Sequence, residues 1–116
     1  MATETNISQD NGIATVKFTG RITLGSSLSL AESQINQLIE NEGARKIIFD
    51  LTNVDFIDSA GLGFVVFMHG RLQEKGGQLR LANPKSQVLD LFRMTHTYGF
   101  LQIDSDAQQS TENLKA

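Results

Sequence analysis

Two hydrophobic periods follow each other in the middle of this chain and predict its central elements. The apolar run from Ile47 to Leu51, continued by Val54, Phe56 and Ile57, is rich in β-branched and aromatic side chains. Such a run is typical of a strand in a sheet that is covered by helices. Farther on the period becomes helical, with an apolar face formed by Leu62, Val65, Val66, His69 and Leu72. Residues 46–72 therefore predict a buried strand followed at once by a helix.

The chain before this stretch predicts a hairpin and a helix. Weak alternation over 6–9 and stronger alternation over 13–18 predict two antiparallel strands joined by a turn at Asp10-Asn11-Gly12. Residues 20–25 follow as a connecting loop. A helix then begins with Ser26 or Ser27 as its cap and ends at Gly43 as a C′ glycine. Its apolar face consists of Leu28, Ala31, Ile35, Leu38 and Ile39.

The chain after the central stretch predicts a further strand, a helix and a short strand. Gly76-Gly77 breaks the chain, and residues 78–82 alternate as a strand does. Asn83 as N-cap with Pro84 at the first helical position predicts a helix, whose buried stripe is Val88, Leu91 and Phe92. Residues 100–103 form a last strand. Residues 104–116 offer only Ala107 and Leu114 for burial, which predicts a tail or a frayed helix.

The order of these elements predicts an α/β fold. Strands that alternate with helices after a hairpin, β-β-α-β-α-β-α-β with a possible C-terminal helix, favour a mixed central sheet with parallel core strands and right-handed crossovers. A chain of 116 residues forms one domain, with its core over about 12–103. A chain of this size buries roughly two-thirds of its unfolded surface, which is enough for one hydrophobic core without a cofactor.

Composition narrows the classes of function. The chain has 0 cysteines, which leaves no disulfide framework and no thiolate chemistry. Its net charge is -3, so no general affinity for nucleic acid or anionic membrane is expected. The N-terminus lacks the pattern of a signal peptide, and the longest strongly apolar run, 64–68, is far shorter than the ~20 residues that span a bilayer. We expect a cytoplasmic protein without direct membrane insertion.

Ser59 stands where the predicted strand gives way to the helix. Asp58 and Ser59 are both helix-capping residue types, so the serine hydroxyl lies at the positive end of the helix macrodipole. Gly61 and Gly63 remove side chains that would keep an anion or a protein surface away from the first turn. Ser59 is therefore either only a helix cap or a site of modification.

The segment DLTNVDFIDSAGLGFVV resembles the anti-sigma factor antagonist family, the bacterial STAS domains. That family carries an Asp-Ser-(Ser/Thr/Ala)-Gly-(Leu/Ile)-Gly element between a buried strand and a helix, and the serine after the aspartate is its phosphorylation site. The resemblance extends over about 12–103 and implies the STAS fold. It implies that Ser59 is phosphorylated and that Asp58, Ala60, Gly61 and Gly63 shape the phosphorylation loop. Ala60 lacks a hydroxyl, so the motif offers one acceptor.

The resemblance further implies a partner switch that regulates transcription. Unphosphorylated, the protein would bind an anti-sigma factor of the GHKL-ATPase serine kinase type, which would phosphorylate Ser59, and a PP2C-type phosphatase would restore binding. Thr23 departs from the family, because many members place an acidic residue there, next to the serine. The alternative is a non-switching scaffold or regulatory STAS subunit, in a stressosome-like assembly or associated with a transporter.

The helix after Ser59 carries more apolar residues than one face can bury. Either all are covered by neighbouring helices and the tail, or some form a docking surface beside the serine. The partner-binding residues expected on this helix are Leu62, Phe64, Phe67 and Met68, and the resemblance implies that Thr23 joins them.

Other chemistry is less well supported by the sequence. A magnesium site is one interpretation of three aspartates that lie close in sequence, Asp50, Asp55 and Asp58, but turn and capping roles explain them better. The AGLG glycines lack the remainder of a nucleotide-binding motif. Neither His69 nor His96 has a partner at metal or triad spacing. We expect neither catalytic apparatus nor cofactor, and so a substrate of enzymes and not an enzyme.

Overall fold

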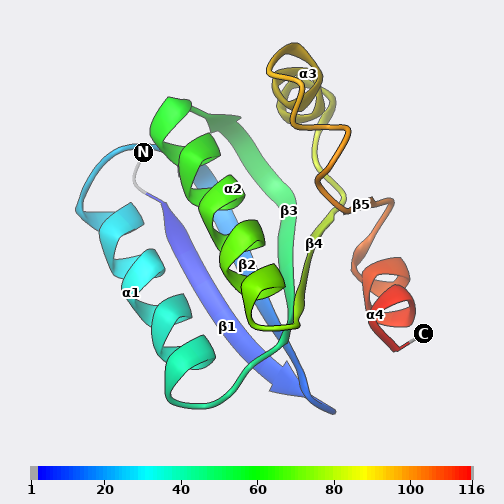
Figure 1. Cartoon of the computed structure of the whole chain (residues 1–116). Coiled ribbons are helices and arrows are strands. Elements are labelled where there is room, and N and C mark those ends of the chain that lie inside the picture. The colour runs from blue at the N-terminus through cyan, green and yellow to red at the C-terminus, as the bar shows by residue number, and fades with distance from the viewer. Residues whose placement is uncertain (1–2, 116) are drawn as a thin grey trace.

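The computed structural model describes residues 3–115 and places them in a five-stranded sheet with four helices (Figure 1). The strands lie in the order β1-β2-β3-β4-β5, which is also their order in the chain. The elements are β1 (Glu4–Asp10), β2 (Ile13–Ile22), α1 (Ser26–Glu40), β3 (Lys46–Ile57), α2 (Ser59–Glu74), β4 (Gln78–Ala82), α3 (Ser86–Met94), β5 (Ile103–Asp104) and α4 (Ala107–Lys115). This order confirms the predicted α/β fold.

The sheet is mixed, as predicted. β1 pairs antiparallel with β2 through a tight turn at Asn11 and Gly12, whose φ angles are 52° and 79°. Two consecutive residues with positive φ give the turn a twist that matches a hairpin, and Asn and Gly are the residue types that tolerate this conformation. β2, β3, β4 and β5 run parallel to one another.

Several predicted boundaries were wrong, including that of the last strand, which was expected over 100–103 and is Ile103–Asp104. β2 continues through Gly20 to Ile22, which the sequence assigned to a loop, because a register shift keeps this segment paired with the long strand β3. α1 has Gly25 as its N-cap and no side-chain cap, so neither Ser26 nor Ser27 takes that position. In each case tertiary pairing or local backbone geometry outweighed the residue type.

A further wrong boundary is the start of α3. The helix begins at Ser86 after Lys85, and not at Pro84. Asn83 has a φ of 51°, a left-handed conformation that does not fit an N-cap. Its backbone N–H instead donates to the carbonyl oxygen of Asp104 at 2.9 Å, which extends the pairing of β4 with β5.

The main core lies between the sheet and helices α1 and α2, which run side by side over one face (Figure 1). Three aromatic rings from β2, β3 and α2 meet there: Phe18 and Phe49 lie 5.0 Å apart edge to face, and Phe49 stacks on Phe64 at 5.6 Å. Such arrangements suit the quadrupoles of the rings. The aromatic cluster fixes α2 against β3 and so fixes the position of the turn that joins them.

The segment for which a tail or frayed helix was expected contains α4. Leu114 of this helix packs against Ile13, Ile48 and Ala82. Ile48 alternates with Ile47 and Phe49 of the main core, so α4 covers the opposite face of the sheet.

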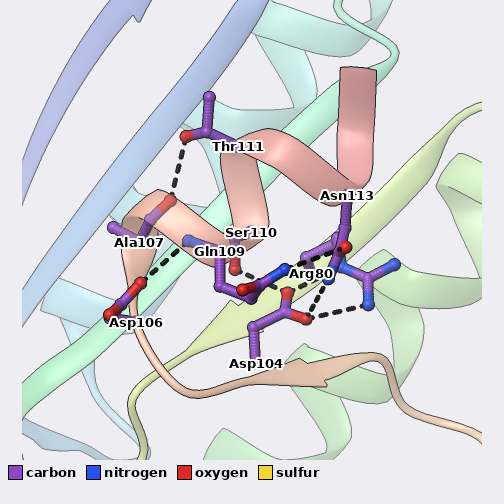
Figure 2. Close-up of polar contacts among 8 residues, drawn as sticks. All are labelled: Arg80, Asp104, Asp106, Ala107, Gln109, Ser110, Thr111 and Asn113. Carbon is purple, nitrogen blue, oxygen red and sulfur yellow. Dashed lines mark hydrogen bonds and ion pairs between the residues drawn. The ribbon is translucent and has the colours of Figure 1, made fainter. Parts of the chain in front are cut away.

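A polar network holds α4 in place (Figure 2). The buried carboxylate of Asp104 accepts hydrogen bonds from Arg80 Nε at 2.6 Å and Nη2 at 2.9 Å, from Ser110 Oγ at 2.6 Å and from Asn113 Nδ2 at 2.7 Å. Burial acts to raise the pKa of Asp104, but the hydrogen bonds from Arg80, Ser110 and Asn113 outweigh it and keep the pKa below its usual value. A fully bonded carboxylate therefore links α4 to β4.

None of the helices within residues 3–115 combines the length and apolar character needed to cross a membrane.

Candidate functional site

Ser59 is the first residue of α2 and is exposed. The residue before it, Asp58, is the N-cap: its backbone is extended, and its Oδ1 accepts the N–H of Gly61 at 2.8 Å. Asp58 therefore supplies the cap, and the interpretation of Ser59 as only a helix cap loses its structural basis. As the first residue of α2, Ser59 lies at the positive end of the helix dipole.

Asp58 also ties a second segment to this turn. Its Oδ2 accepts the backbone N–H of Leu24 at 3.0 Å, and its own N–H donates to the carbonyl of Ile22 at 3.3 Å. The hydrogen bonds from Leu24 and then Gly61 lower the pKa of the Asp58 carboxyl, because they favour its ionised form. The β2–α1 loop and the start of α2 are thus held together through one carboxylate.

Gly61 and Gly63 serve different purposes. A Cβ on Gly61 would press against the backbone carbonyl of Ile22, so the absence of a side chain lets α2 approach β2 closely. A Cβ on Gly63 would meet nothing within 4 Å. Gly63 is exposed and lines a surface groove, so packing within the chain does not require a glycine there.

This groove lies between the first turns of α1 and α2 and encloses about 340 Å³. Its floor is formed by the buried residues Leu28 and Phe64. Its walls carry two prominent apolar side chains, Leu24 with 81% of its surface exposed and Phe67 with 51%. Ala60, directly after Ser59, lines it as well. An apolar recess therefore adjoins the serine.

The expected exposure of Phe64 and Met68 is corrected by the structure. Phe64 is buried in the aromatic cluster, and Met68 is fully buried. The other three expected partner-binding residues, Thr23, Leu62 and Phe67, are at least partly accessible. Of the four apolar residues expected to contact a partner on this helix, Phe67 is exposed and Leu62 is partly buried, because the helical period turns Phe64 and Met68 toward the sheet.

Leu24 was not predicted as a partner-binding residue from the sequence. The residue lies in the β2–α1 connection, where no hydrophobic period applies. The signal that was available is a lone leucine followed by Gly25 in an otherwise polar connection. Its closeness to Ser59 depends on the hydrogen bond to Asp58, which joins residues 34 positions apart.

The three aspartates of the β3 region act separately. Asp50 accepts from the N–H and the hydroxyl of Thr52, Asp55 pairs with Lys85 at 2.6 Å, and Asp58 caps α2. Across residues 3–115 there is no cluster of three or more His, Cys, Asp or Glu side chains that could hold a metal ion. The three aspartate side chains therefore do not converge on a common point where they could bind magnesium.

The two histidines lie away from Ser59's turn in different settings. His69 is buried on α2 with its ring 5.6 Å from that of Phe100, and burial lowers its pKa. Its Nδ1 is buried without a hydrogen-bond partner in the described part of the chain. His96 is exposed in the turn after α3, with a φ of 61°.

The fold and this turn define a class: a small α/β domain that presents a serine at the start of a helix, beside an apolar groove. The chain belongs to the STAS domain family, whose model matches residues 4–110. This confirms the family assignment made from the segment around Ser59.

The proteins similar to this chain include several anti-sigma factor antagonists. The anti-sigma F factor antagonist of Paenibacillus polymyxa is 23% identical over 113 residues, which are 97% of this chain and 96% of that protein. The crystal structure of an anti-sigma factor antagonist from Mycobacterium paratuberculosis superimposes with a TM-score of 0.81 at 13% identity, over 99% of this chain and 96% of that one. The unphosphorylated form of the anti-sigma factor antagonist SpoIIAA gives 0.77 at 16% identity, over 99% of both chains.

Proposed function

We propose that this protein is an anti-sigma factor antagonist that binds an anti-sigma factor through the surface around Ser59 and releases it when Ser59 is phosphorylated. The proposal rests on the separate roles of two neighbouring residues at the start of α2. Asp58 caps the helix, and Ser59 is exposed and does not serve as the cap. SpoIIAA, which has the same fold, has been solved in both unphosphorylated and phosphorylated forms.

The local geometry suits a phosphoryl acceptor. In the proposed reaction Ser59 Oγ forms a bond to the γ-phosphorus of ATP, the bond from that phosphorus to the β-phosphate oxygen breaks, and ADP leaves while the hydroxyl proton is released. The kinase would be the anti-sigma factor itself, of the GHKL-ATPase type. N–H groups and the dipole at the start of α2 stabilise the added anion, so the fold tolerates it.

The effect of the phosphate falls on the interface. It adds about −1.5 to −2 charges and three acceptor oxygens beside the carboxylate of Asp58. Those charges are repelled by an acidic partner and must lose water when a partner covers them, which costs several kcal/mol per buried ion. Binding is therefore expected to fail without a change of fold, and removal of the phosphate by a PP2C-type phosphatase restores it.

The apolar groove supplies the contact that the phosphate interrupts. Leu24 and Phe67 are exposed and line the groove together with Ala60 and Gly63, while Thr23 and Leu62 are partly accessible and adjoin these residues in the chain. Large, exposed apolar side chains around a recess are the usual anchors of protein interfaces. We assign the partner-binding role to Thr23, Leu24, Leu62 and Phe67.

The proposal is tested by capturing partners from a native cell lysate with wild type, Ser59→Ala and Ser59→Asp as baits. We expect wild type and Ser59→Ala to retain a serine-kinase-type ATPase that phosphorylates wild type at Ser59, and Ser59→Asp to lose it. Ser86→Asp is the matched control, because Ser86 is also exposed and also the first residue of a helix.

Two results would contradict the proposal. One is equal capture of the same ATPase by Ser59→Asp and wild type. The other is recovery of only scaffold or membrane proteins by all baits, which would favour a non-switching STAS subunit. Circular dichroism of each bait separates loss of binding from loss of fold.

A further inference from the structure

A polar cavity of about 260 Å³ lies between the β1–β2 hairpin and helix α4. It is lined by residues of the hairpin and of one face of α4: Ser8, Asp10, Asn11, Ile13, Thr15, Thr111 and Lys115. All of these except Ile13 carry polar side chains, and Ile13 is buried against Leu114 of α4. The groove beside Ser59 shares none of these residues. The lining therefore suits a polar ligand.

The cavity exists because α4 covers only part of the second face of the sheet. Ile13 and Thr15 alternate with Ala14 and Val16 of the main core, so their side chains lie on the face opposite α1 and α2. α4 packs mainly over β3, β4 and β5, and on β2 the side chain of Lys17 is exposed. The edge of α4 thus forms a wall beside the hairpin.

Most polar side chains of the cavity are not used within the chain. Thr111 is the lining residue whose side chain is hydrogen-bonded within residues 3–115, and its hydroxyl donates to the carbonyl of Ala107 at 2.9 Å (Figure 2). A hydroxyl oxygen that donates in this way can still accept. The partly buried hydroxyl of Thr15 has no partner in the same part of the chain. These groups are available to a ligand.

Two opposite charges line the cavity without pairing with each other. Asp10 lies on the hairpin and Lys115 on α4, and no ion pair among residues 3–115 includes either of them. A ligand with both a cationic and an anionic group can pair with both side chains at once. A simple cation or anion can pair with only one and is repelled by the other.

The volume restricts the ligand to a small molecule. A water molecule occupies about 30 Å³ in the liquid, so the cavity holds a ligand of about nine non-hydrogen atoms. Cavities for drug-sized ligands are larger, with about 300–1,000 Å³. Free α-amino acids with short side chains have the size and the two charges that this cavity requires.

We propose that this cavity binds a free α-amino acid with a short polar side chain, in its zwitterionic form. The ammonium group of the ligand donates to the carboxylate of Asp10, and Lys115 donates to the carboxylate of the ligand. The hydroxyl groups of Ser8, Thr15 and Thr111 bond to its polar side chain. The ligand bridges the hairpin and α4, so its binding stabilises the contact of α4 with the sheet.

NMR titration of the isotope-labelled full chain with L-serine, L-threonine and L-asparagine tests the proposal. We expect at least one of them to shift the backbone amide peaks of Ser8, Thr15 and Thr111 saturably, with a dissociation constant of about 1 mM or below. Glycerol, acetate and ethylammonium, at the same ionic strength, each lack one or both charged groups. They should bind at least about tenfold more weakly, because a charge-assisted hydrogen bond is lost.

Asp10→Asn and Lys115→Gln each remove one charge with little change of shape. Each should raise the dissociation constant of the amino acid at least about tenfold. Glu4→Gln and Lys17→Gln are the matched controls, because both residues are exposed on the same hairpin and lie outside the cavity. They should leave the dissociation constant unchanged. Circular dichroism shows whether each variant is folded.

Hydrogen exchange tests whether the ligand bridges the hairpin and α4. At ten times the dissociation constant, the amino acid should slow exchange of the α4 amides about tenfold, because opening of α4 then requires release of the ligand. At the same concentration, Lys115→Gln should show a slowing of only about twofold. Unchanged exchange in wild type at saturation would show that the ligand does not bridge α4.

Three other results would overturn the proposal. The first is the absence of a saturable shift with all three amino acids, and the second is equally tight binding of glycerol, which would indicate a site for neutral polyols. The third is an equal effect of the cavity variants and their controls, which would indicate only a response to net charge. Ser59 lies on α2, which packs on the other face of the sheet, and Ser59→Ala should bind the amino acid as wild type does. This proposal and the proposed function therefore succeed or fail separately.

Discussion

The carboxylate of Asp58 accepts the backbone N–H of Leu24 at 3.0 Å while its other oxygen caps α2. One side chain thereby sets both the helix start that carries Ser59 and the position of the most exposed of the large apolar side chains beside it. Within residues 3–115 no other described large hydrophobic residue is as exposed as Leu24. Ser59 and one wall of the proposed docking groove are therefore linked through the side chain of Asp58.

Asp58→Ala is expected to lower the free energy of unfolding by about 1–2 kcal/mol, because it removes a helix cap and a second backbone hydrogen bond. Hydrogen exchange should rise at the Leu24 and Gly61 amides. Asp106→Ala is the matched control, since Asp106 accepts the N–H of Gln109 at the start of α4. It should leave the Leu24 amide unaffected; equal protection of Leu24 in both variants would refute the link.

Gly61→Ala and Gly63→Ala should change the free energy of unfolding in opposite directions. At Gly61 the added methyl group meets the Ile22 carbonyl, which cannot move without breaking the Asp58 hydrogen bond, so we expect a loss of about 1–3 kcal/mol. At Gly63 the methyl group meets open space, and alanine should stabilise the helix by about 0.5–1 kcal/mol. Urea unfolding of both variants measures the difference, and similar effects would contradict this account.

Phe64→Ala and Phe67→Ala separate core from surface on one helix. Loss of the buried Phe64 should cost about 3–5 kcal/mol of unfolding free energy. Phe67 is half exposed, so its removal should change stability by less than about 0.5 kcal/mol while weakening capture of the anti-sigma factor. Undiminished capture by a folded Phe67→Ala protein would remove this residue from the proposed interface.

The pKa of Asp104 is held below its usual value in the folded protein, so the unfolded state binds the proton more readily. Its stabilising contribution is therefore complete above the unfolded pKa, about 4, and is lost as pH falls through the lower folded pKa. Asp104→Asn should lower the unfolding free energy at neutral pH by about 3 kcal/mol because it leaves Arg80 without its counter-ion.

The difference between wild type and Asp104→Asn should shrink as pH falls below 4, since the wild-type carboxyl then also loses its charge. Hydrogen exchange locates the effect: α4 amides should lose protection before those of β3. A pH-independent difference would show that the charge of Asp104 is not what holds α4.

Burial lowers the pKa of His69, so the folded state favours the neutral imidazole. Its contribution to stability is present above the unfolded pKa of about 6.5 and declines as pH falls through the lower folded pKa. His69→Leu should flatten the stability profile below neutral pH. Unfolding measured in the same buffers for both proteins provides the check, and identical slopes would contradict the prediction.

The local sequence was sufficient to predict an element wherever the side-chain period and the backbone preferences of its residues favour the same conformation. The Asn11-Gly12 turn, the strand 47–51 and the helix after Asp58 all follow from residue types that favour one conformation. The start of α3 did not follow, because Asn83 and Pro84 fit a helix start locally while the pairing of Asn83 with Asp104 holds the backbone in another conformation. The sequence could not show a hydrogen bond between residues so far apart in the chain.

The candidate site was likewise predicted only in part. The motif around Ser59 identified the family and led to the proposal of Ser59 as the acceptor, and Asp58 was recognised as a residue that shapes the turn. The exposure of Phe67 and the burial of Phe64 and Met68 depend on how α2 is rotated against the sheet. Five apolar residues in succession, 64–68, cover every direction of a helix, so their period cannot reveal that rotation.

The sequence by itself determined the order of the elements, the α/β class and the place of Ser59 at a strand-to-helix turn, because these depend on local period and on short-range backbone preference. Only the tertiary structure decided that Asp58 ties Leu24 to that turn and that a bonded Asp104 holds α4 on the sheet. Each of these joins residues distant in the chain, and such contacts arise from packing of the whole fold.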